Sequence, residues 1–406
     1  MPKNIVLIIS LDTKGPEAEY IKNSIEAQQN NVTIIDTSSL REPQLKGQVS
    51  SDEIAKAAGF YSGIHGLAKL DRKKASEIMA NGVTKIVEKL YNDGKLDGII
   101  SIGGAMGTFV GTAAMRTLPI GVPKIMVSSM ASGDMKQYVG SKDIIMFNSV
   151  TDIVGGLNRV NRRILANAAK AISAMACVDI QYDVQRPLVG VTSFGILQDQ
   201  IIQIKNALEK EGYEFAAFHG YWGRTSLDEL VESGVVNGGV IDVAISGLYE
   251  LLGVDGTIIG SGGLEAAGKM GLPHIIVPGG ADLFSVPIPI PPKFKKRKYH
   301  FHNPSLPLVR ATADELLPLA KFMCEKINKS EGPTAVIIPL KGFSIYGKEG
   351  GPLFDSEADM TFISKLKSGL KSNIRYLEVD MHINDPEFAH IIMEVFFEIA
   401  QRRRQN

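Results

Sequence analysis

Short apolar runs rich in β-branched residues alternate with stretches of helical periodicity along most of this chain. The run NIVLIIS at 4–10 leads through a glycine-containing loop into a helical pattern at about 16–29, and NVTIID follows at 31–36. Further runs lie at 96–102 and 123–129. Such alternation is typical of parallel strands joined by crossover helices. The sequence therefore predicts an α/β fold with doubly wound parallel sheets.

The same pattern begins again after Pro187, with a strand at 188–193 and a helix at about 198–211. The PIGVPKIMVSSMASGD stretch of the first half also has a counterpart, MGLPHIIVPGGAD, in the second. A chain of 406 residues has room for two domains at roughly 150 residues or more each. We predict two Rossmann-like domains related by internal duplication, 1–184 and 185–406. The cleft between them is the expected ligand site.

Composition narrows the classes of partner and the location. Lys plus Arg number 44, as do Asp plus Glu, so no overall positive field favours nucleic acid or an anionic membrane. We interpret the basic run at 293–298 as a solvated or dimer-contacting arm in preference to a nucleic-acid site. No apolar run approaches the roughly 18 to 20 residues of a membrane span. With Cys177 and Cys324 both expected in the core, the sequence predicts a soluble cytoplasmic protein.

The sequence GGAMGT follows the strand at 96–102 and precedes an apparent helix. Gly103, Gly104 and Gly107 would let backbone amides approach a phosphate at a helix start, and Thr108 adds a hydroxyl. The motif has neither the lysine of a Walker loop nor the spacing of a dinucleotide fingerprint. An anion site and a simple tight turn both remain open from this motif alone.

Other polar loops follow the neighbouring strands and converge on the same predicted sheet edge. Lys14 could neutralise phosphate charge and Asp12 could hold a metal-bound water, although a solvated turn with a helix cap explains both equally well. The residues that could share one pocket are Asp12, Thr13, Lys14, Thr37, Gly103, Gly104, Gly107, Thr108, Ser132 and Gly133.

Ordered blocks along nearly the whole chain carry a family resemblance. In the first half they are SLDTKG, SSDEIAKAAG, GGAMGT, MRTLPIGVPKIMVSSMASGD, YVGSKDI, SVTDIVGGLN and LANAAKAISAM, and in the second SFGILQDQ, FHGYWGR, GLPHIIVPGGAD, HNP and HIND. The chain resembles the ATP-binding family typified by the N-terminal region of the tomato tobamovirus-resistance protein. The resemblance implies a homodimer of two Rossmann-like subdomains, with ATP bound mainly by the first, and Mg²⁺ as an optional companion of ATP.

Matched residue by residue, the resemblance assigns to ATP binding Thr37, Arg72, the glycines of GGAMGT with Thr108, and the loop of Ala131, Ser132 and Gly133. The chain departs from the family in the second half. Ile196 and Leu197 stand where members commonly show paired threonines, and 244–247 replaces a run of threonines followed by glutamate. Whether this chain carries out the chemistry of the family's second domain therefore does not follow from the resemblance.

Three residues of the second half are candidates for catalysis or for gripping a second ligand. Arg224 and Arg310 could hold a carboxylate or phosphate with paired hydrogen bonds. His302 lies in the HNP block. His300 and His302 share a face of an extended segment, but no third ligand has a familiar spacing, so we assign no metal site.

The leading hypothesis is an ATP-dependent enzyme that acts on a small anionic metabolite in the interdomain cleft. The resemblance also implies a partner with a phosphoenolpyruvate-hydrolase-like barrel, because many members are encoded beside or fused to one. The alternative is an ATP-sensing module that docks on another protein without catalysis. A third interpretation, a duplication with vestigial loops, predicts no ATP binding at all.

Overall fold

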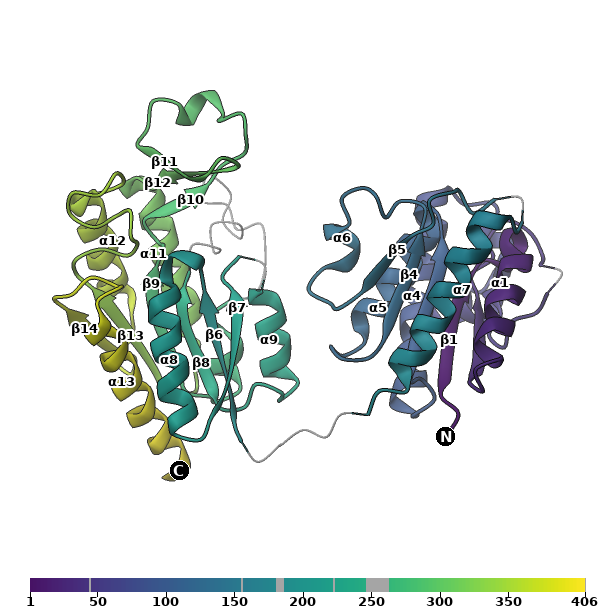
Figure 1. The fold of residues 1–406 in the computed structure, drawn as a ribbon, viewed down its shortest axis with the longest axis horizontal. Coiled ribbons are helices and arrows are strands. Elements are labelled where there is room, and N and C mark those ends of the chain that lie inside the picture. The colour runs from purple at the N-terminus through teal and green to yellow at the C-terminus, as the bar shows by residue number, and fades with distance from the viewer. Residues whose placement is uncertain (44, 155, 180–185, 222, 246–262, 406) are drawn as a thin grey trace. The chain divides into compact units, whose positions relative to one another are not determined.

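A computed structural model describes the chain except residues 44, 155, 180–185, 222, 246–262 and 406. The chain divides into two units, Met1–Gln181 and Tyr182–Asn406, each with its own sheet and core (Figure 1). The prediction of an α/β protein with two parallel-sheet domains is confirmed. Among the described residues, no helix is both long enough and apolar enough to span a membrane.

The first unit is built on one five-stranded parallel sheet. Its strands run in the order β2-β1-β3-β4-β5. Its elements are β1 (Asn4–Ile9), α1 (Leu11–Glu26), β2 (Asn31–Asp36), α2 (Ser51–Ala57), α3 (Gly63–Leu67), α4 (Arg72–Asn92), β3 (Gly98–Gly103), α5 (Ala105–Thr117), β4 (Lys124–Ser128), α6 (Lys136–Val139), β5 (Ile145–Asn148) and α7 (Arg159–Ala176).

Both faces of this sheet are covered by helices, which explains the continuous apolar runs. In β1, Ile5 and Leu7 face the core under α1 and α7, and Val6 and Ile8 face a second core under α2, α4 and α5. All four side chains are at most 1% exposed. A strand buried on both faces has no polar alternation, as expected for a parallel sheet.

The second unit has a six-stranded parallel sheet in the order β14-β13-β9-β8-β6-β7 and a three-stranded antiparallel sheet β10-β12-β11. Its elements are β6 (Leu188–Ser193), the 3₁₀ turn η1 (Gly195–Leu197), α8 (Gln198–Lys210), β7 (Glu214–His219), α9 (Arg224–Glu232), β8 (Gly239–Ala244), α10 (Ala266–Lys269), β9 (His274–Gly279), β10 (Leu283–Ser285), the 3₁₀ turn η3 (Pro292–Phe294), β11 (Tyr299–Asn303), β12 (Leu306–Arg310), α11 (Ala313–Ile327), β13 (Thr334–Pro339), α12 (Ser356–Gly369), β14 (Arg375–Val379) and α13 (Pro386–Gln405).

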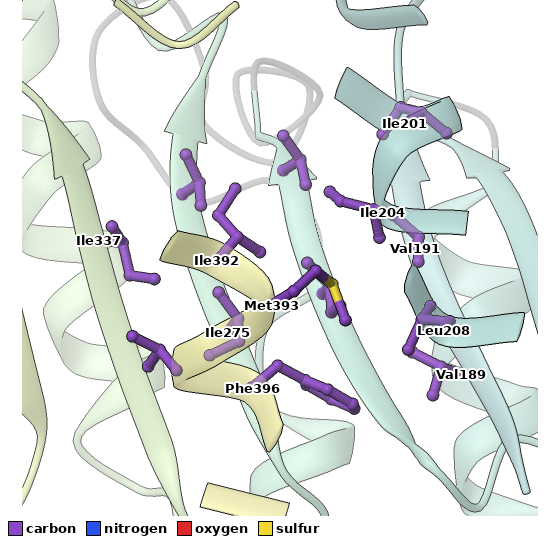
Figure 2. Packing of buried hydrophobic residues seen from close by; sticks show 14 of the residues in the cluster. Val189, Val191, Ile201, Ile204, Leu208, Ile275, Ile337, Ile392, Met393 and Phe396 are labelled. Atoms are coloured by element: carbon purple, nitrogen blue, oxygen red, sulfur yellow. The ribbon is translucent and has the colours of Figure 1, made fainter. Parts of the chain in front are cut away.

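The helices α8 and α13 cover one face of the larger sheet. Figure 2 shows Ile392, Met393 and Phe396 of α13 directed at the strands, beside Ile204 and Leu208 of α8. The opposite face packs mainly against α11 and α12. The second unit therefore has a core of its own on each side of its sheet.

The two parallel sheets share one topology. From the edge of its second strand, the sheet of the second unit runs β7-β6-β8-β9-β13-β14, which repeats the order β2-β1-β3-β4-β5 and adds one strand. The pairing register also repeats, because Ile5 lies opposite Gly98 and Val189 lies opposite Gly239. The shared order and register support the predicted duplication.

Four details differ from the sequence-based expectations. The helix α5 begins at Ala105, inside the GGAMGT motif, and β5 is a strand that we did not predict. The proline-rich stretch at 287–304, which contains the basic run that we interpreted as an arm, supplies β11 of the antiparallel sheet. Cys324 is buried as predicted, but Cys177 is exposed, because it follows the last turn of α7.

Candidate functional site

A cavity of about 390 Å³ opens at the carboxyl edge of the first sheet, where β1 and β3 lie side by side. In the order 2-1-3-4-5 these strands flank the topological switch point, which is the usual ligand crevice of doubly wound sheets. The volume lies within the range of small-molecule sites. The lining comprises Ser10, Asp12, Thr13, Lys14, Ser39, Leu40, Leu67, Ala68, Leu70, Arg72, Ala75, Ile102, Gly103, Gly104, Ala105, Met106, Gly107, Asp152, Ile153 and Val154.

One wall is the turn from β3 into α5. A Cβ atom on Gly103 would lie 2.7 Å from the Cα of Gly107, so the close approach of strand end and helix requires glycine. Gly104 is the N-cap residue, and its carbonyl accepts the amide of Thr108 at 2.8 Å. The first-turn amides of α5 have no partner within the helix and carry the positive end of its dipole. This wall is suited to a phosphate group.

Two cationic side chains line the same cavity. Lys14 has non-helical backbone angles (φ −134°, ψ 31°) that interrupt α1, and its Nζ donates to the Thr13 hydroxyl at 3.1 Å. Arg72 is the first residue of α4, which Asp71 caps by accepting the amide of Lys74 at 2.9 Å. Arg72 has no hydrogen bond or ion pair from its guanidinium to a described residue, so both side chains can turn toward an anion.

Apolar side chains also line the cavity. Leu67 belongs to the short helix α3, and Leu70 and Ala75 flank the start of α4. Met106 adds its side chain from α5. A planar apolar group such as a nucleobase fits a wall of this kind. These residues could not be predicted from the sequence, because their apolar pattern is that of any amphipathic helix.

Two carboxylates also line the cavity. The Oδ2 atom of Asp12 accepts the amides of Ser39 at 3.4 Å and Leu40 at 3.1 Å, so this carboxylate orders the loop after β2. Asp152 is exposed and accepts only the amide of Ile153, at 2.8 Å, among the described residues. Asp152 was not among the predicted site residues, although it lies in the SVTDIVGGLN block.

Other residues predicted to bind ATP lie beside the cavity without lining it. The Thr37 hydroxyl is buried 3.0 Å from the Ser10 hydroxyl. The Thr108 hydroxyl is buried 2.7 Å from that of Ser128. Ala131, Ser132 and Gly133 form the turn after β4 and are absent from the cavity lining. Contact of these five residues with a ligand stays a prediction.

A second cavity of about 610 Å³ shares Asp12 and Thr13 with the first. Its lining is Leu11, Asp12, Thr13, Gly15, Pro16, Glu19, Arg41, Glu42 and Leu45. The Nε atom of Arg41 donates to the carbonyl of Asp12 at 3.1 Å. The first-sheet cavities thus share the turn that precedes the regular part of α1.

In the second unit, Arg224 is the first residue of α9, and its side chain is buried. Its Nη1 donates to Oδ1 of Asp242 at 2.8 Å and its Nη2 to the carbonyl of Ala244 at 2.7 Å. His274 lies 2.8 Å from the other carboxylate oxygen of Asp242. Burial raises the pKa of Asp242, but Arg224 and His274 outweigh burial and hold it at about 2. Arg224 therefore neutralises a buried carboxylate.

Arg310 and His302 lie elsewhere in the second unit, on β12 and β11. Arg310 is 3% exposed and donates to Oδ1 of Asp359 at 2.6 Å. His302 is exposed, with its Nδ1 2.9 Å from the Tyr346 hydroxyl. The described contacts of Arg224, Arg310 and His302 do not join them into one site, and their catalytic roles stay predictions. No group of three or more potential metal ligands occurs in the part of the chain that the structure describes.

Comparison with known proteins gives matches over the whole chain. Two models of the uncharacterised protein family UPF0261 match, the N-terminal domain at residues 3–181 and the C-terminal domain at residues 186–400. A UPF0261 protein of Clostridium tetani is 38% identical over 96% of this chain and 97% of its own length. Another, from Mesorhizobium japonicum, is 34% identical over 98% of this chain and 100% of its own length.

The ToMV resistance protein Tm-1(GCR237) of Solanum lycopersicum is 30% identical over 98% of this chain and 56% of its own length. Among solved structures, the UDP-N-acetylglucosamine 2-epimerase of Rickettsia bellii covers 99% of this chain and 97% of its own, at 10% identity and a TM-score of 0.24.

Proposed function

The chain belongs to the UPF0261 family, whose N- and C-terminal domains it carries in order, and on that premise we propose that its first domain binds ATP in the cavity at the carboxyl edge of the first sheet. One observation carries the proposal. The cavity is lined by a glycine turn at a helix N-terminus, by two cations and by a set of apolar side chains. This lining matches a ligand that has both a polyphosphate and a base.

The phosphate end is assigned to Gly103, Gly104 and Gly107, with Lys14 and Arg72 as counter-charges. Charge-assisted hydrogen bonds of this kind contribute about 1.5 to 3 kcal/mol each. The base end is assigned to Leu67 and its apolar neighbours from α3 and α4. Free phosphate would use only the first of these two ends, so ATP explains more of the lining.

A divalent ion fits the polar side of this cavity. Mg²⁺ prefers oxygen ligands and usually combines one or two carboxylates with phosphate oxygens and water. Asp152 is the exposed carboxylate of the lining, since Asp12 is engaged by backbone amides. When bound, Mg²⁺ would neutralise phosphate charge.

We further propose that the protein is an ATP-dependent enzyme with a small anionic metabolite as second ligand. Under this proposal the cytoplasmic protein acts as a homodimer and cooperates with a phosphoenolpyruvate-hydrolase-like barrel protein. The alternative is an ATP-sensing module that docks on another protein. Both functions are compatible with a nucleotide site of this lining, and turnover of ATP distinguishes them.

The test is calorimetric titration with ATP, adenosine and inorganic triphosphate, followed by a turnover assay alone and with a panel of carboxylated and phosphorylated metabolites. We expect ATP to bind more tightly than either fragment. Turnover that appears with one metabolite supports the enzyme, and ATP binding with no turnover supports the docking module. Absence of ATP binding would refute the proposal.

A further inference from the structure

Asp12 lies on the turn that the two cavities of the first unit share. It lines both of them, as does Thr13. The Thr13 hydroxyl accepts from Nζ of Lys14 at 3.1 Å, and Lys14 is one of the cations assigned to the phosphates of ATP. Asp12 is therefore in contact with the space of the proposed ATP site and with that of the second cavity.

Three of the four polar atoms of Asp12 have fixed partners. Its amide donates to the Ser38 hydroxyl at 2.9 Å, and its carbonyl accepts from Nε of Arg41 at 3.1 Å. Its Oδ2 atom accepts the amides of Ser39 at 3.4 Å and Leu40 at 3.1 Å. The residue is 9% exposed, and its Oδ1 atom has no hydrogen-bond partner in the part of the chain that the structure describes. One carboxylate oxygen is thus held by the backbone, and the other is left for a ligand.

A second buried carboxylate fixes the position of this turn. Oδ1 of Asp36, the last residue of β2, accepts the amide of Leu11 at 3.0 Å and the hydroxyl of Ser38 at 2.5 Å. The same Ser38 hydroxyl accepts the amide of Asp12. Groups that take part in catalysis are held in place by contacts of this kind with the residues behind them. The network gives Asp12 the fixed geometry that a catalytic carboxylate needs.

The second cavity offers charges of both signs to a ligand. Apart from the bond of its Nε to Asp12, the guanidinium of Arg41 has no partner among the described residues, so its Nη atoms are available for a carboxylate. Glu19 and Glu42 line the same cavity and are exposed. Their carboxylates attract an ammonium group. The lining therefore suits a small molecule with a carboxylate, and favours one that also carries an ammonium group.

We propose that the second cavity binds a small hydroxy acid and that Asp12 is the general base for transfer of the γ-phosphoryl group of ATP to its hydroxyl. The inference rests on the proposed ATP site and names the class of its second ligand. A base with one free oxygen acts on a group that has a proton to lose, which selects a hydroxyl. Arg41 holds the carboxylate, and Glu19 and Glu42 favour serine-like over glycerate-like acceptors.

The transfer step follows from this placement. The hydroxyl oxygen of the acceptor forms a bond to the γ-phosphorus. The bond from that phosphorus to the β,γ-bridging oxygen breaks, and ADP leaves with its electron pair. The hydroxyl proton passes to Oδ1 of Asp12, which later releases it to water. An aspartate that accepts the proton of an acceptor hydroxyl is a recurring part of phosphoryl transfer.

The experiment uses the full chain in Mg²⁺ and three probes: L-serine, D-glycerate, and L-alanine as the probe without a hydroxyl. Calorimetry measures the affinity for the non-hydrolysable analogue AMP-PNP, and then the affinity of the AMP-PNP-loaded protein for each probe. Release of ADP from ATP is measured with the same probes. We expect serine and alanine to bind more tightly than glycerate. Only serine and glycerate should raise ADP release above its level without a probe.

Two variants separate the base from the acceptor site. Asp12→Asn keeps an oxygen for the amides of the loop but cannot take the proton, so kcat with serine should fall by about a hundredfold or more at equal or tighter AMP-PNP affinity. Asp93→Asn makes the same change at an exposed position of the first unit and is the control. Arg41→Gln should raise the KM for serine by about tenfold to a hundredfold. Lys46→Gln, exposed on the same loop, is its control.

The outcomes distinguish this inference from the proposal on which it rests. A wild type that does not bind AMP-PNP would refute both. AMP-PNP binding without binding or turnover of serine and glycerate would overturn the inference alone. Wild-type kcat in Asp12→Asn would exclude Asp12 as the base, and a loss of Mg²⁺-dependent AMP-PNP affinity in that variant would make it a metal ligand instead. If Asp12→Asn does not fold, an unchanged KM for serine in Arg41→Gln would overturn the acceptor site.

Discussion

Arg310 donates from Nη2 to Oδ1 of Asp359 at 2.6 Å, and its Nη1 lies 3.5 Å from Oδ2 of Asp282. One buried guanidinium is thus the ion-pair partner of two buried carboxyl groups. Burial is the largest influence on both acids and raises the pKa of Asp282, and it raises the pKa of Asp359 to about 7 against the opposing effect of Arg310. The cluster therefore holds a proton near neutral pH.

Stability should depend on this proton. Because the pKa of Asp359 is higher in the folded protein than in the unfolded chain, the folded protein binds a proton between about pH 4 and pH 7 that the unfolded chain has released. The free energy of unfolding should fall as the pH rises through that window, by about 2 kcal/mol between pH 5 and pH 8. Urea unfolding of Asp359→Asn should show a flatter pH dependence than the wild type, and the exposed control Asp314→Asn should not. An Asp359→Asn protein with the full wild-type slope would contradict this assignment.

Replacing Arg224 should destabilise the second unit. Arg224→Met leaves the buried carboxylate of Asp242 without its main counter-charge, at an expected cost of about 3 to 5 kcal/mol in the free energy of unfolding. Arg375→Met is the control, since Arg375 pairs with Glu398 at the surface, where an ion pair contributes about 1 kcal/mol or less. If Arg224→Met instead retained its stability and lost turnover or binding of a second ligand, Arg224 would have the catalytic role that we predicted from the sequence.

Gly107→Asp should abolish ATP binding without unfolding the first unit. A Cβ atom at Gly107 meets the carbonyl oxygen of Ile102 at 3.4 Å, a tolerable contact, and a carboxylate in the first turn of a helix is favourable for the fold. The same carboxylate would repel the phosphates. Gly195→Asp, in an open position of the second unit, is the matched control for calorimetry and circular dichroism. Unchanged ATP affinity in folded Gly107→Asp would remove the phosphate assignment.

Neutralising Lys14 or Arg72 should weaken ATP binding. For Lys14→Gln and Arg72→Gln we expect losses of roughly tenfold to a hundredfold, since each removes about 1.5 to 3 kcal/mol of charge-assisted bonding. Lys73→Gln, at the exposed position after Arg72, should leave the affinity near that of the wild type. Equal effects of the substitutions at 72 and 73 would indicate a general charge effect and no specific contact.

A fragment of residues 1–181 should fold and bind ATP. The two buried clusters around the first sheet contain only residues of the first unit, so removal of the second unit exposes neither core. Circular dichroism and calorimetry on the purified fragment check this expectation. A folded fragment that does not bind ATP would show that the second domain contributes to the nucleotide site.

The parallel strands could be predicted from sequence because burial on both faces turns them into unbroken apolar runs. The strand β5 was missed because it is a short edge strand with partly exposed side chains. The antiparallel sheet was missed because tertiary contacts, not local pattern, hold its proline-rich segment. Examples are the ring contact of Phe284 with Phe294 and the ion pair of Arg297 with Glu315.

The candidate site was predictable only in part. The glycines around Gly104 have a recognisable motif and line the cavity. The apolar lining residues and Asp152 reach the site through the tertiary fold. The sequence around each of them contains no motif that would predict this position. Arg310 is a strong candidate for anion binding by residue type, but two carboxylates distant in sequence occupy its guanidinium.

The repeated strand order has a consequence for synthesis on the ribosome. Two copies of one topology within a single polypeptide offer look-alike strands, and β6 could take the place of β1 if both were free at once. Every strand of the first sheet precedes residue 182, so that sheet can close before the second set leaves the exit tunnel. Domains generally fold in this order during translation. Vectorial synthesis thus separates the copies in time, and refolding of the whole chain from denaturant removes that separation.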